Sequence, residues 1–229
     1  MLRFNSDHKF KIMQIADTQE IPAVSPDTLS LINNALDREK PDLVIFTGDQ
    51  IKGYSKKFKK DPAIIESTID ILVEPIAKRN IPFMVTYGNH DAQCGIDNRG
   101  QYKFYAKYDN FISGDLRNSD DVGTADIQIY SSTEDKPVFE LYIIDSHGKA
   151  KDGAGYAPVD KKQIEWYVSR REQLKAENGG YLPSLVFQHI PVPEFFDVIK
   201  KVPKGTKGAV PAYGAHENEY FVLNDETIA

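Results

Sequence analysis

Short apolar runs alternate with stretches of helical periodicity along most of this chain, and this alternation restricts its fold more than any other feature. The apolar runs are rich in β-branched or aromatic residues, have the length of strands, and cover residues 10–15, 43–46, 82–87, 138–144 and 184–188. Helices are expected to begin at Pro26, at Pro62 and after Asp160, where Pro and Asp suit the first helical positions. The alternation predicts an α/β fold with parallel central strands. Residues 126–131 are expected to add an antiparallel strand, which a turn joins to residues 138–144.

Length and charge exclude several other classes of protein. A chain of 229 residues suits one large domain, and we expect a single domain over residues 1–229. Its net charge of −6 argues against the broad basic surface of a nucleic-acid-binding protein. A single cysteine, Cys94, cannot form an intrachain disulfide, and we expect it to be a small buried residue. The N-terminus lacks the apolar core of a signal peptide, and the apolar runs are too short to span a bilayer, so we expect a cytoplasmic protein without a membrane partner.

Side chains that suit metal binding or acid–base chemistry follow four of the predicted strands. They are Asp17 and Gln19, Asp49, the run Asn89-His90-Asp91, and His189. Ligands of open α/β sheets bind beyond the carboxyl ends of the strands, so these residues are expected to share one layer. Carboxylate and amide oxygens with imidazole nitrogens suit Mn, Fe or Zn better than Mg. One carboxylate can bridge two such ions about 3.5–4 Å apart, the spacing used to hydrolyse phosphate esters.

The order of these residues resembles the motifs of the calcineurin-like metallophosphoesterases. The motifs are Asp17-x-Gln19, Gly48-Asp49, Gly88-Asn89-His90-Asp91 and a later His189. Asp145-Ser146, followed by Tyr156, Gln163 and Trp166, is similar to the bacterial and fungal branch near the purple acid phosphatases. The resemblance implies a four-layer sandwich, with two central mixed sheets flanked by helices. It also implies two divalent metal ions of uncertain identity and a small phosphorylated substrate. The implied reaction is phosphate ester hydrolysis, favouring monoesters, by hydroxide attack at a two-metal centre.

The resemblance also implies a role for each site residue. Asp17 would bind the first ion and Asp49 would bridge both, while Asn89 and His189 would bind the second. His90 would act as the general acid that protonates the leaving group, and Asp91 would orient it. Gln19 stands where the family has a histidine, and the sequence leaves open whether it is a weak ligand or a hydrogen-bond donor.

A second departure from the family lies near the C-terminus. The family's Gly-His-x-His motif, which gives one imidazole to each ion, does not occur, and we expect a domain that lacks its C-terminal part and ends on the helix before that strand. His216 and His147 are the candidates for a substitute ligand. Two alternatives therefore stand beside a phosphomonoesterase. One is a phosphodiesterase or nucleotide pyrophosphatase, and the other is a degenerate domain with little activity. The sequence does not predict the oligomeric state.

Two further features lie near the predicted site. The basic run 56–60 follows Asp49. Such a run is more typical of a solvated loop than of a segment that binds the substrate phosphate. Tyr54 follows the bridging residue Asp49 at a spacing that differs from that of the tyrosine ligand in purple enzymes. We therefore expect Tyr54 not to bind the metal.

Overall fold

The computed structural model describes residues 1–114, 121–150, 155–192, 201–202, 209–213 and 219–223. The chain divides into two compact units, Met1–Ile190 and Pro191–Ala229. A single domain over residues 1–229 stays a prediction.

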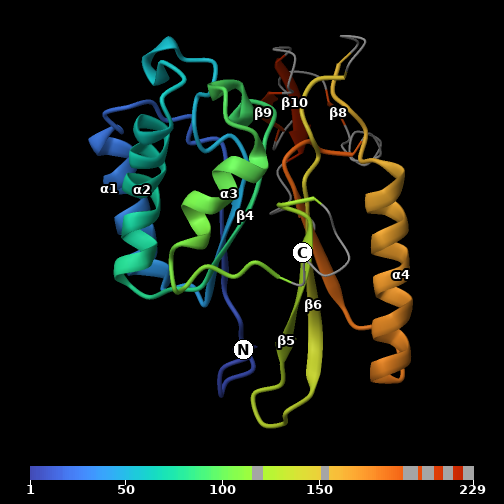
Figure 1. Cartoon of the computed structure of the whole chain (residues 1–229). Helices are drawn as coiled ribbons and strands as arrows, with labels where there is room; N and C mark the ends of the chain where they lie inside the picture. The colour runs from blue at the N-terminus through green and yellow to red at the C-terminus, as the bar shows by residue number, and fades with distance from the viewer. Residues whose placement is uncertain (115–120, 151–154, 193–200, 203–208, 214–218, 224–229) are drawn as a thin grey trace. The chain divides into compact units, whose positions relative to one another are not determined.

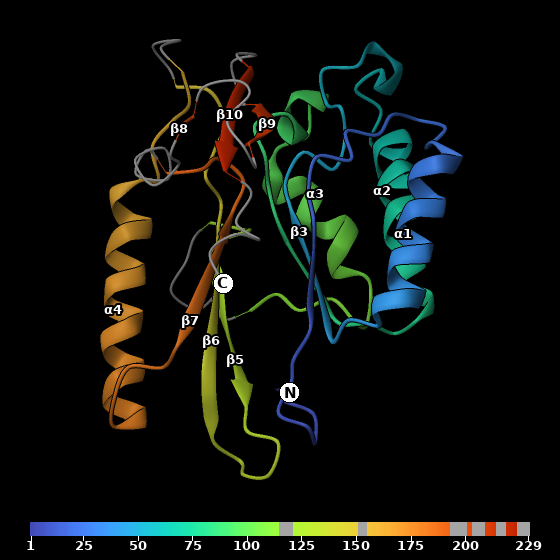
Figure 2. The same ribbon diagram turned by 180° about the vertical axis from the view of Figure 1, so that it is seen from behind.

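The first unit contains two β-sheets with helices on their outer faces (Figures 1 and 2). The three-stranded sheet has the order β2 (Ile12–Ile15), β3 (Leu43–Thr47) and β4 (Phe83–Thr86) and is wholly parallel. The four-stranded sheet has the order β1 (Leu2–Arg3), β5 (Ala125–Tyr130), β6 (Pro137–Ile144) and β7 (Ser184–Gln188), with β5 and β6 antiparallel. The helices are α1 (Pro26–Glu39), α2 (Pro62–Lys78), α3 (Asn98–Ala106), α4 (Lys161–Asn178) and the 3₁₀ turns η1 (Lys56–Phe58) and η2 (Asp91–Cys94). The predicted sandwich is confirmed, although the three-stranded sheet is parallel where a mixed one was expected.

The alternation of side chains along β3 explains how the layers are held together. Val44 and Phe46 pack with residues of α1 and α2, such as Leu36 and Ile69, in one apolar core. Leu43 and Ile45 point to the opposite face, because successive strand residues alternate, and pack against the four-stranded sheet in a second core. A strand buried on both faces reads as a continuous apolar run, and all five residues of β3 are buried.

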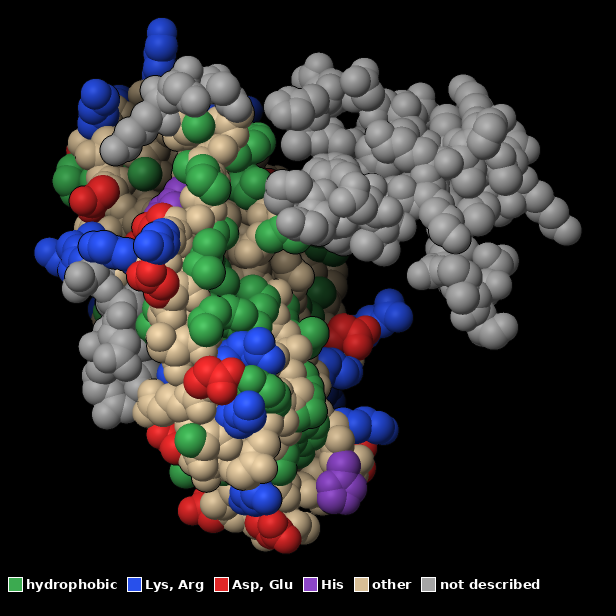
Figure 3. All heavy atoms as spheres, turned by 90° about the vertical axis from the view of Figure 1, so that its right-hand side faces the viewer, with side chains coloured by type: hydrophobic (Ala, Val, Ile, Leu, Met, Phe, Trp, Pro, Cys, Tyr) green, Lys and Arg blue, Asp and Glu red, His purple; other side chains and the backbone are tan. Residues whose placement is uncertain are grey.

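Helix α4 covers the outer face of the four-stranded sheet. Its residues Trp166 and Leu174 are buried against Tyr142 of β6. Asp160 caps the helix through a reciprocal pair of bonds with Gln163, and Gly179 ends it in a left-handed conformation. The exposed face of this side of the molecule carries charges of both signs between apolar side chains (Figure 3).

The second unit contains β8 (Lys201–Val202), β9 (Ala209–Tyr213) and β10 (Glu219–Leu223). They form an antiparallel sheet in the order β8-β10-β9. The expected helix at the end of the chain falls on residues 224–229, which lie outside the described residues. The β-branched and aromatic content of Tyr220–Val222 suits the strand β10. Among the described residues, no helix is both long and apolar enough to cross a membrane.

Candidate metal centre and active site

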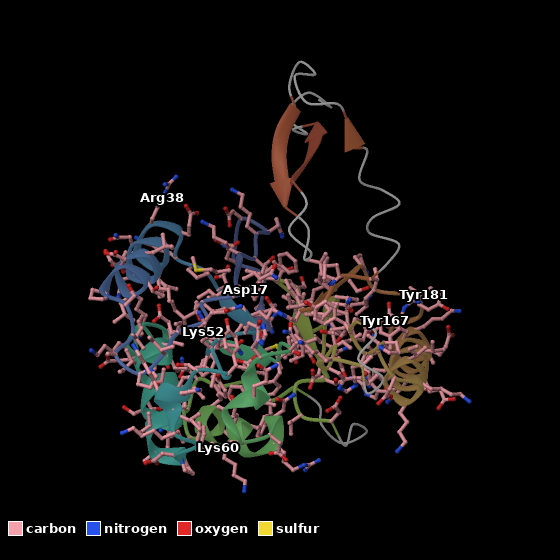
Figure 4. The ribbon with its side chains drawn as sticks, turned by 90° about the horizontal axis from the view of Figure 1, so that it is seen from above. Asp17, Arg38, Lys52, Lys60, Tyr167 and Tyr181 are labelled. Atoms are coloured by element: carbon pink, nitrogen blue, oxygen red, sulfur yellow. The ribbon has the colours of Figure 1, made fainter. Side chains whose placement is uncertain are left out.

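Four loops carry the predicted site residues, and each follows the carboxyl end of a strand. Asp17 follows β2, Asp49 follows β3, Asn89 follows β4 and His189 follows β7. Viewed onto this end of the strands, Asp17 lies toward the middle, between α1–α2 on one side and α4 on the other (Figure 4). One ligand atom each from Asp17, Asp49 and His189 lies within 4.8 Å of the others. The structure therefore places these predicted ligands, which come from both sheets, together.

Two glycines allow this close approach of the loops. Gly48 has a φ of +105°, and a Cβ atom there would lie 2.5 Å from the Gly88 nitrogen and 2.7 Å from His189 Nδ1. A Cβ atom on Gly88 would lie 2.6 Å from the Asp49 nitrogen. Side chains at either position would push the loops after β3, β4 and β7 apart, so glycine is required by the site itself.

The His189 imidazole is oriented for metal binding. Its Nδ1 lies 3.0 Å from the Thr47 carbonyl oxygen, which can only accept, so Nδ1 carries a proton. The other nitrogen, Nε2, lies 3.2 Å from Asn89 Oδ1 and 3.5 Å from Asp49 Oδ2. In the neutral ring Nε2 is also an acceptor, so three acceptors face one another. A proton on Nε2 or a metal ion would satisfy such an arrangement, and a bond from Nδ1 to a carbonyl is the usual support of a metal-binding histidine.

Asp49 lies at the centre of the group, and its side chain is 2% exposed. Its Oδ1 accepts a hydrogen bond from the backbone nitrogen of His90 at 2.8 Å. Its Oδ2 lies 4.0 Å from His90 Nε2 and faces His189. This position between the other groups is the one expected of a carboxylate that bridges two ions.

The pKa values of the neighbouring groups reflect their crowding. Partial burial and the negative charge of Asp49 raise the pKa of Asp17, while His189 and His90 act in the opposite direction. Burial lowers the pKa of His189, but its contact with Asp49 and the charges of Asp49 and Asp17 outweigh burial and raise it. The Asp17 shift thus follows mainly from burial, and the His189 shift follows from the two carboxylates beside it.

Asp91 has a different role from the predicted one. Its Oδ2 accepts hydrogen bonds from the backbone nitrogens of Asp49 at 2.7 Å and Gly88 at 2.8 Å, and its Oδ1 accepts one from Ile51 at 3.2 Å. Burial raises the pKa of this carboxyl group to about 7, against the effect of the three N–H donors. Its oxygens are directed at the loops after β3 and β4, so Asp91 holds these loops together. The ring of His90 is held instead by Gln93, whose Oε1 lies 3.0 Å from Nδ1.

Gln19 donates a hydrogen bond within the site, and its role as a weak metal ligand stays a prediction. Its Nε2 donates to Asp49 Oδ2 at 3.3 Å. Its Oε1 accepts from the Tyr54 hydroxyl at 3.4 Å. The amide oxygen keeps a second lone pair beside this bond. Tyr54 also contacts the ring of His90.

A second polar group lies around His147, one of the two predicted substitute ligands. Asp121, Asp145 and His147 also place one ligand atom each within 4.8 Å of the others. Gln163 binds this group together, because it donates to Asp121 and to the Asp145 carbonyl and accepts from His147. His147 is therefore tied to this second group. His216, the other candidate, lies outside the described residues.

The sequence assigned no role to Ser146, which supports the site. Ser146 Oγ accepts from the Ile190 nitrogen at 2.9 Å and so fixes the loop that carries His189. The sequence marked Ser146 only as part of the Asp145-Ser146 motif. The basic run 56–60 has exposed lysines around a buried Phe58, as expected of a solvated segment. Cys94 is buried, as predicted.

The fold and the site define a metal-binding α/β sandwich, and comparison with known proteins identifies its family. The sequence profile of the calcineurin-like phosphoesterases matches residues 10–227, and the chain belongs to this family. It is 29% identical over 230 residues to a protein of Arabidopsis thaliana named probable inactive purple acid phosphatase 14, covering 85% of this chain and 56% of that protein. It is 32% identical over 232 residues to the phosphatase DCR2 of Saccharomyces cerevisiae, covering 90% of this chain and 39% of that protein. The chain thus spans about half or less of these relatives.

A solved structure supports the fold. The chain superposes on a dimetal phosphatase from Danio rerio with a TM-score of 0.54 and 14% sequence identity, covering 80% of this chain and 70% of that one. At this level of identity the similarity concerns the sandwich architecture alone.

Proposed function

We propose that this chain hydrolyses phosphate esters, monoesters in preference to diesters, with two divalent metal ions held by Asp17, Asp49, Asn89 and His189. The observation that carries the proposal is the convergence of acceptors on His189 Nε2, which faces Asn89 Oδ1 at 3.2 Å and Asp49 Oδ2 at 3.5 Å. The donor set of carboxylate, amide and imidazole groups suits Mn, Fe or Zn. When bound, the metals would supply an activated water and polarise the phosphoryl oxygens.

The residues around the ions have separable tasks. Asp17 and Asp49 are two carboxylates against two dications, so the loaded centre keeps a net positive charge, which attracts an anionic phosphate. His90 directs Nε2 toward the same space, 4.0 Å from Asp49 Oδ2. From there it can give a proton to the departing oxygen of the ester. Asp91 keeps the loops of Asp49 and Gly88 at the distance that the ligands need.

The experiment that tests this proposal compares substrates of different leaving groups with purified chain loaded with Mn²⁺ or Zn²⁺. His90→Asn should retain its metal and lose roughly 10²–10⁴-fold in rate on alkyl phosphates. An aryl ester with an acidic alcohol needs little protonation and should lose less. Equal losses on both esters would remove His90 as the general acid, and loss of metal would make it a ligand. Faster turnover of a diester than of a matched monoester would favour the phosphodiesterase alternative.

A domain with weak or no activity is the second candidate, and the orientation of Gln19 favours it. Position 19 is a glutamine and gives no imidazole to the first ion, and its amide donates to Asp49 Oδ2. Three of the relatives, all from Arabidopsis thaliana, carry the word inactive in their names. Metal analysis and the ester assay together separate the two candidates. A chain that binds two ions and hydrolyses none of the test esters would support the inactive alternative.

A further inference from the structure

The ring of His90 is held on two sides. On one side, Nδ1 lies 3.0 Å from Gln93 Oε1. On another, the Tyr54 ring meets the imidazole edge-to-face, with ring centroids 4.7 Å apart and an interplanar angle of 63°. These contacts leave Nε2 directed at the site, where it lies 4.0 Å from Asp49 Oδ2.

The Gln93 amide is itself fixed in one orientation. Its Nε2 donates to the Asn89 carbonyl oxygen at 3.1 Å. Turning the amide over would place Oε1 against that carbonyl, and two acceptors would then face each other. Oε1 is therefore the atom presented to His90. Because an amide oxygen can only accept, His90 Nδ1 must carry a proton, and Nε2 is the nitrogen that exchanges one with the site.

The local backbone explains why a glutamine at this spacing reaches the ring. His90 is the cap residue of η2 (Asp91–Cys94), and the Gln93 nitrogen donates to the His90 carbonyl oxygen at 3.0 Å. In a 3₁₀ turn the side chains of residues i and i+3 lie one above the other. The pair His90 and Gln93 has this spacing, so the turn aligns the amide with the imidazole.

We infer that Gln93 is a positioning residue that fixes the tautomer and orientation of His90 for proton donation from Nε2. Only the kinetic consequence of this inference rests on the proposed function. Donation from Nε2 starts from the doubly protonated ring and leaves the neutral Nδ1–H form, which the Gln93 oxygen stabilises. Without Gln93, the ring can rotate and this product form is no longer favoured, so His90 would be a less effective acid. Among the described residues, the Gln93 side chain bonds no ligand side chain; its hydrogen bonds go to the His90 ring and to the backbone carbonyl of Asn89.

The kinetic test uses Gln93→Met, which keeps the length of the side chain and removes both hydrogen bonds. Gln173→Met is the matched control, because Gln173 is exposed on α4 and its side chain bonds Glu177 alone within the described part of the chain. Gln93→Met should lower kcat on an alkyl phosphate by roughly 10-fold, a part of the whole contribution of a general acid, with KM little changed. The loss on an aryl ester should be smaller, and the control should match the native chain on both.

A double variant distinguishes positioning from a general structural role. If Gln93 acts through His90, adding Gln93→Met to His90→Asn should cause no further loss of rate. Losses that multiply in the double variant, or equal losses on alkyl and aryl esters, would overturn the inference.

A spectroscopic measurement tests the same inference without any turnover. Long-range ¹H–¹⁵N spectra at pH 9, where histidines are ordinarily neutral, report which ring nitrogen carries the proton. The His90 signals are assigned as those missing in His90→Asn. The native chain should contain the Nδ1–H form, and Gln93→Met should shift toward the Nε2–H form or a mixture. An unchanged Nδ1–H form in Gln93→Met would overturn the inference. If the native chain hydrolyses no ester, the proposed function fails, and this spectrum alone decides the role of Gln93.

Discussion

Removing the Asp91 side chain should destabilise the unit Met1–Ile190 strongly, although Asp91 touches no substrate. Its carboxylate accepts hydrogen bonds from three backbone nitrogens, those of Asp49, Gly88 and Ile51, and the residue is 1% exposed. Asp91→Ala leaves these buried donors without their acceptor. Each such donor costs about 1–3 kcal/mol, so with partial relaxation we expect a loss of about 3–5 kcal/mol in the free energy of unfolding.

Urea unfolding followed by the fluorescence of Trp166, the one tryptophan of the chain, measures this loss in the unit that holds the site. Asp91→Asn keeps an oxygen for two of the donors and should lose about 2 kcal/mol. Asp61→Ala is the control, because the exposed Asp61 side chain accepts a bond from the Ala63 nitrogen at the start of α2. This substitution should lower the free energy of unfolding by about 1 kcal/mol. If the free energy of unfolding of Asp91→Ala lies within about 0.5 kcal/mol of the native value, Asp91 does not hold the two loops together.

Three further predictions concern the site and the buried charges. Gly88→Ala should lower metal affinity by at least roughly 10-fold in equilibrium dialysis, because its Cβ would press on Asp49; unchanged affinity would show that the loops can part freely. Gln19→His should raise metal affinity roughly 10-fold by supplying an imidazole, and weaker binding would mean that the Gln19 amide is already a ligand. Burial and the neighbouring Asp126 raise the pKa of Glu140 from 4.5 to about 9, so the folded chain retains a proton that the unfolded chain releases. The stability from Glu140 is therefore present below pH 4.5 and lost as the pH rises toward 9. The Glu140→Gln side chain cannot ionise, so its stability relative to the native chain in urea unfolding should be greater at pH 9 than at pH 5. The same change in the free energy of unfolding with pH in both chains would contradict this.

The sequence predicts the elements whose signals are local. The strands at Leu43–Thr47 and Ser184–Gln188 contain apolar and β-branched runs, and helix α2 begins at Pro62 with Asp61 as its cap, as expected. Strand β1 was missed because Leu2–Arg3 is two residues long and pairs with β5, more than a hundred residues away. Helix α3 was missed because it is short and polar and contains Gly100, although Asp97 caps it.

The site divides in the same way. Motif order places Asp17, Asp49 and His189 together, because the carboxyl ends of parallel strands meet at one edge. The roles of Asp91 and Gln93 could not be read from the order of residues. They depend on which backbone donors surround a buried carboxylate and on how one 3₁₀ turn aligns two side chains.

The metal content of Asp49→Asn tests the central claim most directly. The side chain keeps its shape but loses its charge and one strong ligand at the position that faces both His189 and His90. Asp42→Asn is the control at the other end of β3, where Asp42 accepts a bond from the Lys11 nitrogen at 2.7 Å. After dialysis against Mn²⁺ or Zn²⁺ and elemental analysis, the native chain and Asp42→Asn should hold their metal and hydrolyse the ester, while Asp49→Asn should lose both properties. Retention of both metals and near-native hydrolysis by Asp49→Asn would contradict the account.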